Sequence, residues 1–243
     1  MGRYLRRFYR ENMQAAGLVS FRVEIGESDL FIFAERDLAA EARASLAAHR
    51  ADLEGFIARQ PRFRTSHTSY DVPEDSPPLV RLMAESAARV GVGPMAAVAG
   101  AVAEMVGKDL GSLSPEVIVE NGGDIYIRST RERSVGIFAG ESPLSGRLAL
   151  KLPSTPPEGL GVCTSSATVG PSFSAGGADA ALVVAEGAAL ADAAASALGN
   201  RAKTAEHIEE ALAAVSAVEG VIGCLVIVGE NLGVQGDLEL EKK

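Results

Sequence analysis

Two residues in an alanine-rich stretch near the C-terminus have the chemistry and spacing of a metal site. Asp192 and Ser196 stand four positions apart, so on a helix their carboxylate and hydroxyl share one face. Oxygen ligands suit Mg²⁺, which commonly takes its remaining ligands from water and from substrate phosphates. This pair predicts a magnesium site. The alternative is a solvated Asp192 and a small packing residue at Ser196.

A second candidate lies between two expected strands and reads Asn121-Gly122-Gly123-Asp124. Paired glycines let a ligand approach the backbone closely. Asn121 and Asp124 supply hydrogen-bonding groups on either side of them. The segment predicts a binding turn, with an ordinary hairpin turn as the alternative.

A third candidate is the Ser/Thr/Gly-rich segment 163–177, in which Thr164, Ser165 and Ser166 come first. Hydroxyl groups and exposed backbone amides of such a loop can donate hydrogen bonds to a phosphate or pyrophosphate. The segment lacks the glycine and lysine spacing of a P-loop, and the chain has no GxGxxG pattern. It predicts a cofactor-binding loop, and a surface loop is the alternative.

Histidine and cysteine chemistry is not indicated. The residues His49, His67 and His207 share no ligand spacing, and we interpret them as surface residues. Cys163 and Cys224 are too few for a disulfide framework in a chain of 243 residues, so we interpret them as two buried thiols in reducing cytosol.

Composition restricts the class of partner. Lys and Arg number 23 against 32 Asp and Glu, a net charge of −9, which argues against a nucleic-acid binder. The longest nearly apolar stretch, 91–107, contains Pro94 and Glu104 and is shorter than the roughly 20 residues that a membrane span needs. No signal peptide is apparent. We therefore expect a cytoplasmic protein that contacts neither nucleic acid nor membrane.

The elements expected to position these residues are strands and helices of ordinary length. Apolar alternation or short apolar runs predict strands at 18–25, 29–34, 117–120, 125–128, 135–139, 147–152, 180–185 and 221–228. Helical spacing and end signals predict helices from 38 to before 61, from 76 to 90, after Pro94, from 188 to 198 with a stop at Gly199-Asn200, and after Thr204. The strands from 117 to 152 are expected to form one antiparallel meander. Together these features predict an α+β fold.

An internal similarity accompanies this pattern. Residues 32–57 align without gaps on residues 183–208, and nine of the 26 positions are identical, five of them alanine. In both segments a strand precedes a helix. The chain is therefore expected to be a single domain, 1–243, with a possible internal duplication into lobes at about 1–110 and 111–243.

Taken in order, the three motifs resemble those of the ApbE family, whose members are FAD:protein FMN transferases. Gly122-Gly123-Asp124 matches the family's Gly-Gly-Asp segment, and residues 192–197 match its Asp-Ala-x-x-Thr-Ala helix, with serine for threonine. The segment at 163–170 occupies the place of the family's Thr-Ser-Gly segment. The similarity covers roughly residues 90–235 and is closest to an uncharacterised branch of ApbE-like proteins.

This resemblance implies a T-fold-like α+β architecture of antiparallel sheets packed with helices. It also implies that Asp192 and Ser196 bind Mg²⁺ on the pyrophosphate of FAD. T-fold proteins join strands across subunits, so a homodimer or larger homo-oligomer is expected.

Two departures bear on catalysis. Ala99 stands where the family carries a lysine, and residues 170–177 stand where it carries His-x-x-Asp-Pro-x-x-Gly. We therefore expect a protein that binds a flavin or nucleotide-like ligand, with FMN transferase activity reduced or lost and no catalytic residue assigned. The alternatives are a non-catalytic T-fold scaffold and an enzyme acting on a pterin-like or purine-like ring.

Overall fold

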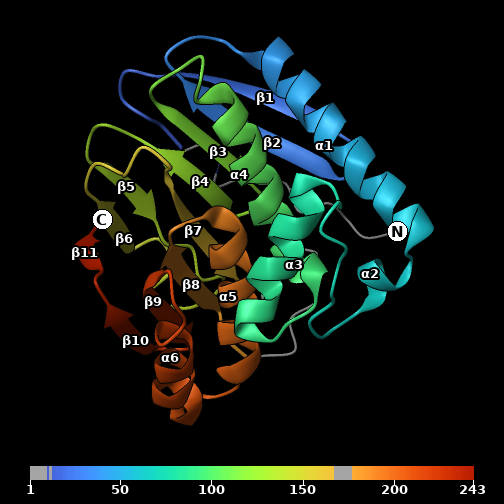
Figure 1. Cartoon of the computed structure of the whole chain (residues 1–243). Coiled ribbons are helices and arrows are strands. Elements are labelled where there is room, and N and C mark those ends of the chain that lie inside the picture. Colours follow the sequence, from blue (N-terminus) through green and yellow to red (C-terminus); the bar gives the residue numbers. More distant parts are fainter. Residues whose placement is uncertain (1–9, 11–12, 167–176) are drawn as a thin grey trace.

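An eight-stranded antiparallel sheet forms the centre of the fold (Figure 1). The computed structural model describes residue 10 and residues 13–166 and 177–243. Within these residues the strand order is β1-β2-β3-β4-β7-β8-β9-β10. The strands are β1 (Val19–Ile25), β2 (Ser28–Ala34), β3 (Val117–Asn121), β4 (Asp124–Arg128), β7 (Leu160–Ser165), β8 (Ala180–Ala185), β9 (Val221–Val228) and β10 (Asn231–Gly236).

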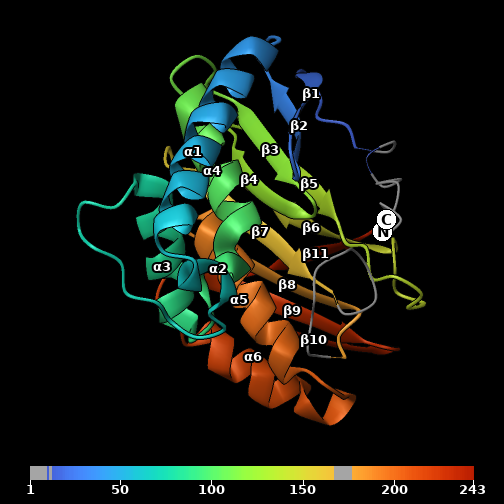
Figure 2. The same ribbon diagram turned by 90° about the vertical axis from the view of Figure 1, so that its right-hand side faces the viewer.

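Helices cover one face of this sheet (Figure 2). They are α1 (Ala39–Arg59), α2 (Arg62–Thr65), α3 (Pro78–Val90), α4 (Val98–Leu110), α5 (Ala188–Arg201) and α6 (Ile208–Ser216), with short 3₁₀ turns at η2 (Pro94–Ala97) and η3 (Ala205–His207). Seven alanines of α5 are fully buried, because this helix packs against β7, β8, α3 and α4. Small side chains let it approach all of them closely.

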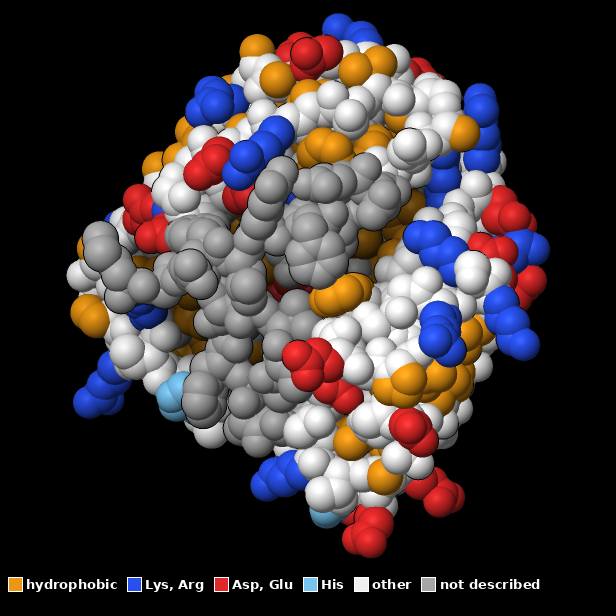
Figure 3. Space-filling model, turned by 180° about the vertical axis from the view of Figure 1, so that it is seen from behind, with side chains coloured by type: hydrophobic (Ala, Val, Ile, Leu, Met, Phe, Trp, Pro, Cys, Tyr) orange, Lys and Arg blue, Asp and Glu red, His pale blue; other side chains and the backbone are white. Residues whose placement is uncertain are grey.

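A smaller sheet covers the opposite face, with the order β11-β6-β5 (Figure 2). Its strands are β5 (Arg133–Gly136), β6 (Leu148–Leu152) and β11 (Glu239–Lys242). Leu150 of this sheet packs with Ile118 and Ile127 of the large sheet in a second hydrophobic core. Viewed from this side, Lys and Arg side chains are intermixed with Asp and Glu side chains (Figure 3).

The large sheet contains the same arrangement twice. The hairpin β1-β2 is followed by α1 to α4 and then by the hairpin β3-β4, and the hairpin β7-β8 is followed by α5 and α6 and then by β9-β10. In each half the helices separate two hairpins that lie side by side. The first half of the sheet thus extends to Arg128 of β4. A division of the chain into two lobes stays a prediction.

Several expected elements are confirmed. Strands β1 and β2 form a hairpin around Gly26-Glu27, and Gly26 has a φ of +57°, a conformation that suits a two-residue hairpin turn. Helix α1 ends at Arg59, before Pro61. The apolar runs at 180–185 and 221–228 are strands β8 and β9.

Three expectations are wrong. The strands from 117 to 152 do not form one meander, because β3 and β4 belong to the large sheet while β5 and β6 pair with β11. The expected loop at 163–165 is the end of β7. Helix α5 does not stop at Gly199 but continues to Arg201, and Gly199 does not take the left-handed conformation of a glycine that ends a helix.

No single helix among the described residues is long and apolar enough to cross a membrane. The pair Pro78–Val90 and Pro94–Leu110 reaches that length and composition only together, across a bend of 105°.

Candidate functional site

Asp192 joins helix α5 to the beginning of helix α4. Its Oδ2 atom accepts a hydrogen bond of 2.9 Å from the backbone N–H of Gly100, and the backbone N–H of Ala99 also bonds to this carboxylate. The N-cap residue of α4, Ala97, offers no side-chain bond of its own. Asp192 therefore satisfies amides that the first turn of a helix leaves without partners.

The close approach of the two helices depends on a glycine. A β-carbon at Gly100 would lie 2.1 Å from the Ala188 carbonyl oxygen and 2.7 Å from Asp192 Cβ. Those distances are shorter than any van der Waals contact. Glycine at position 100 is thus required for Asp192 to reach α4.

The predicted binding turn connects β3 to β4, next to the same helix. Gly122 and Gly123 have φ values of +73° and +105°, which side chains other than glycine rarely adopt. Asn121 and Asp124 face one another across the turn. The Asn121 side-chain amide donates to the Ala99 carbonyl at 3.1 Å, so the turn is fastened to the start of α4.

Asp192 lies close enough to Asp124 to raise the free-energy cost of ionising the Asp124 carboxyl. Burial raises the pKa of Asp124 well above its usual range, and the charge of Asp192 raises it further. Burial also raises the pKa of Asp192 to about 7, against the lowering effect of the Gly100 and Ala99 amides. Each of these carboxyls therefore binds its proton more tightly than an isolated, solvated carboxyl does.

Cys163 completes this cluster from β7. It pairs with Asp124 in the β4–β7 register, and its thiol lies within hydrogen-bonding reach of the Asp124 carboxyl and 3.3 Å from the Ala188 carbonyl oxygen. Burial raises the pKa of the Cys163 thiol well above its usual range, and the two carboxylates add to the effect. The thiol is therefore a neutral packing and hydrogen-bonding group here.

The remaining predicted residues lie at the end of β7 and on α5. Thr164 and Ser165 end β7, and Ser166 follows; all three are partly exposed. The Thr164 backbone bonds to Asp124. Ser196 is partly exposed on α5, one turn beyond Asp192. The rest of the expected loop, 167–176, lies outside the described residues.

A metal ion held by protein side chains alone is not indicated. Among the described residues, no group of three or more His, Cys, Asp or Glu side chains is placed to hold one. The adjacent carboxyls of Asp124 and Asp192 nevertheless suit a divalent cation, because a cation would relieve their mutual repulsion. Such an ion would need water or ligand oxygens to complete its coordination.

The sequence did not indicate how the neighbouring groups contribute. Cys163 is buried, as expected, but no sequence pattern indicates its contact with Asp124 or the bond from the Gly100 amide to Asp192. The pairing of Asp124 with Cys163 depends on strand register, which no local pattern reveals. Ala99, expected to replace a lysine, bonds through its backbone to both Asn121 and Asp192.

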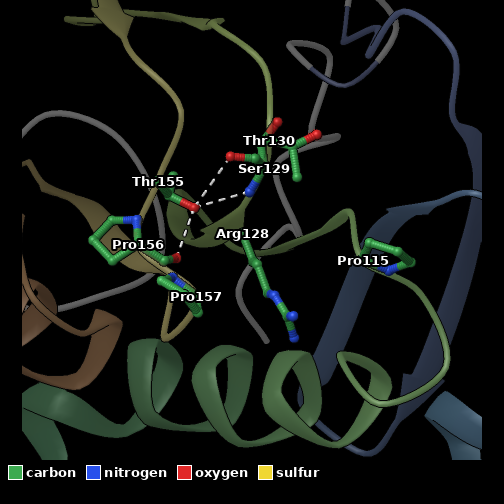
Figure 4. Close-up of a pocket in the computed structure, with 7 residues that line it drawn as sticks. All are labelled: Pro115, Arg128, Ser129, Thr130, Thr155, Pro156 and Pro157. Atoms are coloured by element: carbon green, nitrogen blue, oxygen red, sulfur yellow. Dashed lines mark hydrogen bonds between the residues drawn. The ribbon is translucent and has the colours of Figure 1, made fainter.

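A cavity of about 150 Å³ lies at the other end of β4 (Figure 4). Its polar groups already have partners: the Thr155 hydroxyl accepts from the Ser129 backbone N–H at 2.9 Å, the Ser129 hydroxyl donates to Glu116, and Arg128 donates to the Gly111 carbonyl. These bonds join the segment that follows β4 to the segments before β3 and before β7, so we assign the cavity a structural role.

Comparison with known proteins identifies the family. A family model described as "AbpE bacteria" matches residues 10–231. The chain belongs to this family. As an AbpE family member it has relatives among methanogens: a UPF0280 protein of Methanocella arvoryzae is 44% identical over 190 residues, covering 78% of this chain and 77% of the relative. The UPF0280 protein MK0206 of Methanopyrus kandleri is 38% identical, with 90% and 91% covered.

Solved structures share the fold of this AbpE family member. The flavin transferase ApbE from Vibrio cholerae superposes with a TM-score of 0.59 at 11% identity, covering 93% of this chain and 97% of the other. The apbe protein of Thermotoga maritima gives 0.58 at 12% identity, covering 89% and 96%. The predicted α+β fold of ApbE type is confirmed.

Proposed function

We propose that this protein binds FAD, or a ligand with the same nucleotide pyrophosphate, together with Mg²⁺ held by Asp192 and Ser196 beside Asp124. The observation that carries the proposal is the proximity of two carboxyls, the buried Asp124 of β4 and the partly exposed Asp192 of α5. One oxygen-rich pair beside a glycine turn suits a hard cation that is shared with a phosphate ligand. The flavin transferase named among the structural neighbours supports flavin as the first candidate.

Each residue has a part in this proposal. Asp192 supplies a carboxylate to the cation, and Ser196, one turn later on the same face of α5, supplies a hydroxyl. When bound, Mg²⁺ would neutralise the charge of the pyrophosphate. Gly122 and Gly123 leave room for the ligand beside the backbone.

The partly exposed end of β7 supplies further donors. The hydroxyls of Thr164, Ser165 and Ser166 can bond to phosphate oxygens. Ser165 lies against α5, since a β-carbon at Gly199 would be 3.5 Å from its Oγ atom. The proposed phosphate donors and the proposed metal ligands thus belong to neighbouring elements.

We further propose that transfer of FMN to a protein acceptor is weak or absent. Breaking the pyrophosphate requires positive or proton-donating groups near the departing phosphate as well as a metal. Ala99 lies beside Asp192 and carries no charge. Binding without efficient transfer is therefore the function that the described residues support best.

Titration calorimetry with FAD tests this proposal. The wild-type protein is titrated in Mg²⁺ and again in EDTA, and we expect binding that weakens at least about tenfold on chelation. Asp192→Asn is the informative variant, because asparagine keeps an oxygen acceptor for the Gly100 amide while removing the charge. We expect this variant to bind FAD as weakly as the chelated wild type.

Asp52→Asn is the matched control, since Asp52 is exposed on α1 and should leave FAD affinity unchanged. Equal affinity in Mg²⁺ and EDTA would remove the metal from the proposal. No FAD binding by folded wild-type protein would favour the non-catalytic scaffold instead.

A further inference from the structure

The buried side chain of Glu120 supports the glycine turn of the proposed site. Only 1% of this side chain is exposed. Its Oε1 atom accepts a hydrogen bond of 2.8 Å from the backbone N–H of Gly123. Because Gly123 has a φ of +105°, a conformation that glycine adopts readily and other residues rarely do, this bond helps to fix the turn's conformation.

The other oxygen of Glu120 bonds to a residue 110 positions earlier in the chain. Its Oε2 atom accepts from Nε of Arg10 at 2.5 Å. The Arg10 guanidinium also bonds to the Asp29 carboxylate at 2.9 Å and to the Asp29 carbonyl at 2.7 Å. It lies over the ring of Phe31, 5.7 Å from the centroid. Arg10 is thus held against β2 while it pairs with β3.

The ion pair of Arg10 with Glu120 affects the geometry of the glycine turn, because Glu120 also bonds to the Gly123 amide. A buried carboxylate is stable in its ionised form only when a cation and hydrogen bonds compensate its lost hydration. Without the guanidinium of Arg10, the Glu120 carboxylate would lose this compensating charge and be drawn toward water. That movement would weaken the bond that it accepts from Gly123.

The turn is held from both sides of the sheet. Asn121 fastens it to α4 on the face covered by helices, whereas Glu120 supports it on the face where Phe31 packs in the second core. The charge of Glu120 also acts on Asp124. A change at Arg10 would therefore affect the proposed ligand site through Glu120 and the Gly123 amide that bonds to it.

We propose that Arg10 is a positioning residue that sets the Gly122-Gly123 turn through Glu120 and thereby controls the affinity of the ligand site. The inference rests on the proposed function for the identity of that ligand. It makes Arg10 a control point, because withdrawal of its guanidinium from Glu120 would release the turn.

Amide hydrogen exchange measured by NMR on the full chain tests the structural part without any ligand. In Arg10→Gln the Gly123 amide should exchange about tenfold faster or more, as expected on weakening a bond to a charged acceptor. Arg10→Lys keeps a cation and should retain most of the protection. FAD affinity, measured by calorimetry in Mg²⁺, should fall about tenfold in Arg10→Gln and recover in Arg10→Lys.

Two further variants separate positioning from general damage to the fold. Arg22→Gln is the matched control, because Arg22 bonds to the same Asp29 carboxylate at 2.6 Å but its side chain is 57% exposed and it should leave Gly123 exchange unchanged. The double variant Arg10→Gln with Glu120→Gln removes the uncompensated charge. It should return Gly123 exchange close to the wild-type rate.

The outcomes distinguish this inference from the proposed function. Unchanged Gly123 exchange in Arg10→Gln overturns the inference whether or not FAD binds. Faster exchange with unchanged FAD affinity also overturns it, because the turn would then not control the site. Failure of the wild type to bind FAD contradicts the proposed function, while the exchange data still decide the role of Arg10 in the turn.

Discussion

Glu104 of α4 and Asp192 of α5 each bond to a backbone amide in the first turn of the other's helix. Glu104 accepts from the Ala189 N–H at 3.0 Å, and Asp192 accepts from the Gly100 N–H at 2.9 Å. Neither α4 nor α5 has a side-chain cap at its own N-cap residue. Carboxylates at helix N-termini are favoured by the helix dipole. The two reciprocal hydrogen bonds therefore stabilise both helices and fix Asp192 beside Asp124.

The first prediction concerns Gly100, the glycine that lets α4 and α5 approach closely enough for these two hydrogen bonds. Gly100→Ala should lower the free energy of unfolding by roughly 1–3 kcal/mol, the usual cost of overpacking, because its β-carbon would overlap the Ala188 carbonyl. Gly55→Ala in α1 is the control. Its β-carbon would be 3.6 Å from the nearest atom, so it should stabilise by up to about 1 kcal/mol. Urea denaturation measures both, and equal effects would contradict the packing argument.

The second prediction is a dependence of stability on pH. The folded protein keeps protons on Asp124 and Asp192 that the unfolded chain loses near pH 4, because the pKa of Asp192 is raised from 3.8 to about 7. The unfolded state therefore binds fewer protons between these values, and stability falls as pH rises from 4 to 7. Denaturation across this range should show a smaller decline in Asp192→Asn than in the wild type. An unchanged slope in that variant would refute the raised pKa.

The third prediction concerns the buried ion pair of Glu116 and Arg133, whose side chains are 5% and 9% exposed. The bonds that Glu116 accepts from Thr130, Arg133 and Ser129 outweigh burial and lower its pKa to about 2. Arg133→Ala should destabilise the protein by about 3–5 kcal/mol, because it leaves the carboxylate without its cation. The exposed Arg131 gives the control: Arg131→Ala should change stability by less than about 0.5 kcal/mol. Thermal denaturation compares the two, and similar losses would show that the pair is unimportant.

The fourth prediction is that FMN is not efficiently transferred from FAD to a threonine or serine of an acceptor protein. Losing one well-placed stabilising group costs about 10²- to 10³-fold in rate. This chain has alanine at 99 in place of the family's lysine, and residues 170–177 lack the family's His-x-x-Asp-Pro-x-x-Gly pattern. The assay incubates protein, FAD, Mg²⁺ and an acceptor with the family's target motif, and mass spectrometry detects an FMN adduct. An acceptor with the target residue changed to alanine controls for bound flavin. Adduct formation over many turnovers would restore the transferase assignment.

Much of the fold could be predicted because its signals are local. The helix α1 has regular apolar spacing, and the strands β8 and β9 are continuous apolar runs. Strand β10 was missed because most of its residues are exposed and only Leu232 and Val234 give it apolar alternation, interrupted by Gly233. The separation of β5 and β6 into a second sheet depends on β11, about 90 residues later, and no local pattern carries that pairing.

The candidate site was predicted in pieces. Asp124 and Asp192 each stood in a recognisable motif, but their proximity depends on the pairing of β4 with β7 and on the packing of α5 against α4. The bond from Glu120 to Arg10 spans 110 residues, and sequence spacing gives no sign of it. The expected homo-oligomer and cytoplasmic location stay predictions.

The fifth prediction, and the most direct test of the account, is the position of a bound cation. Mn²⁺ accepts the same oxygen ligands as Mg²⁺ and is visible by anomalous scattering in crystals grown with FAD. We expect an anomalous peak within about 2.5 Å of both the Asp192 carboxylate and the Ser196 hydroxyl, next to the pyrophosphate. FAD bound in the crystal with no peak at these two residues would contradict the account.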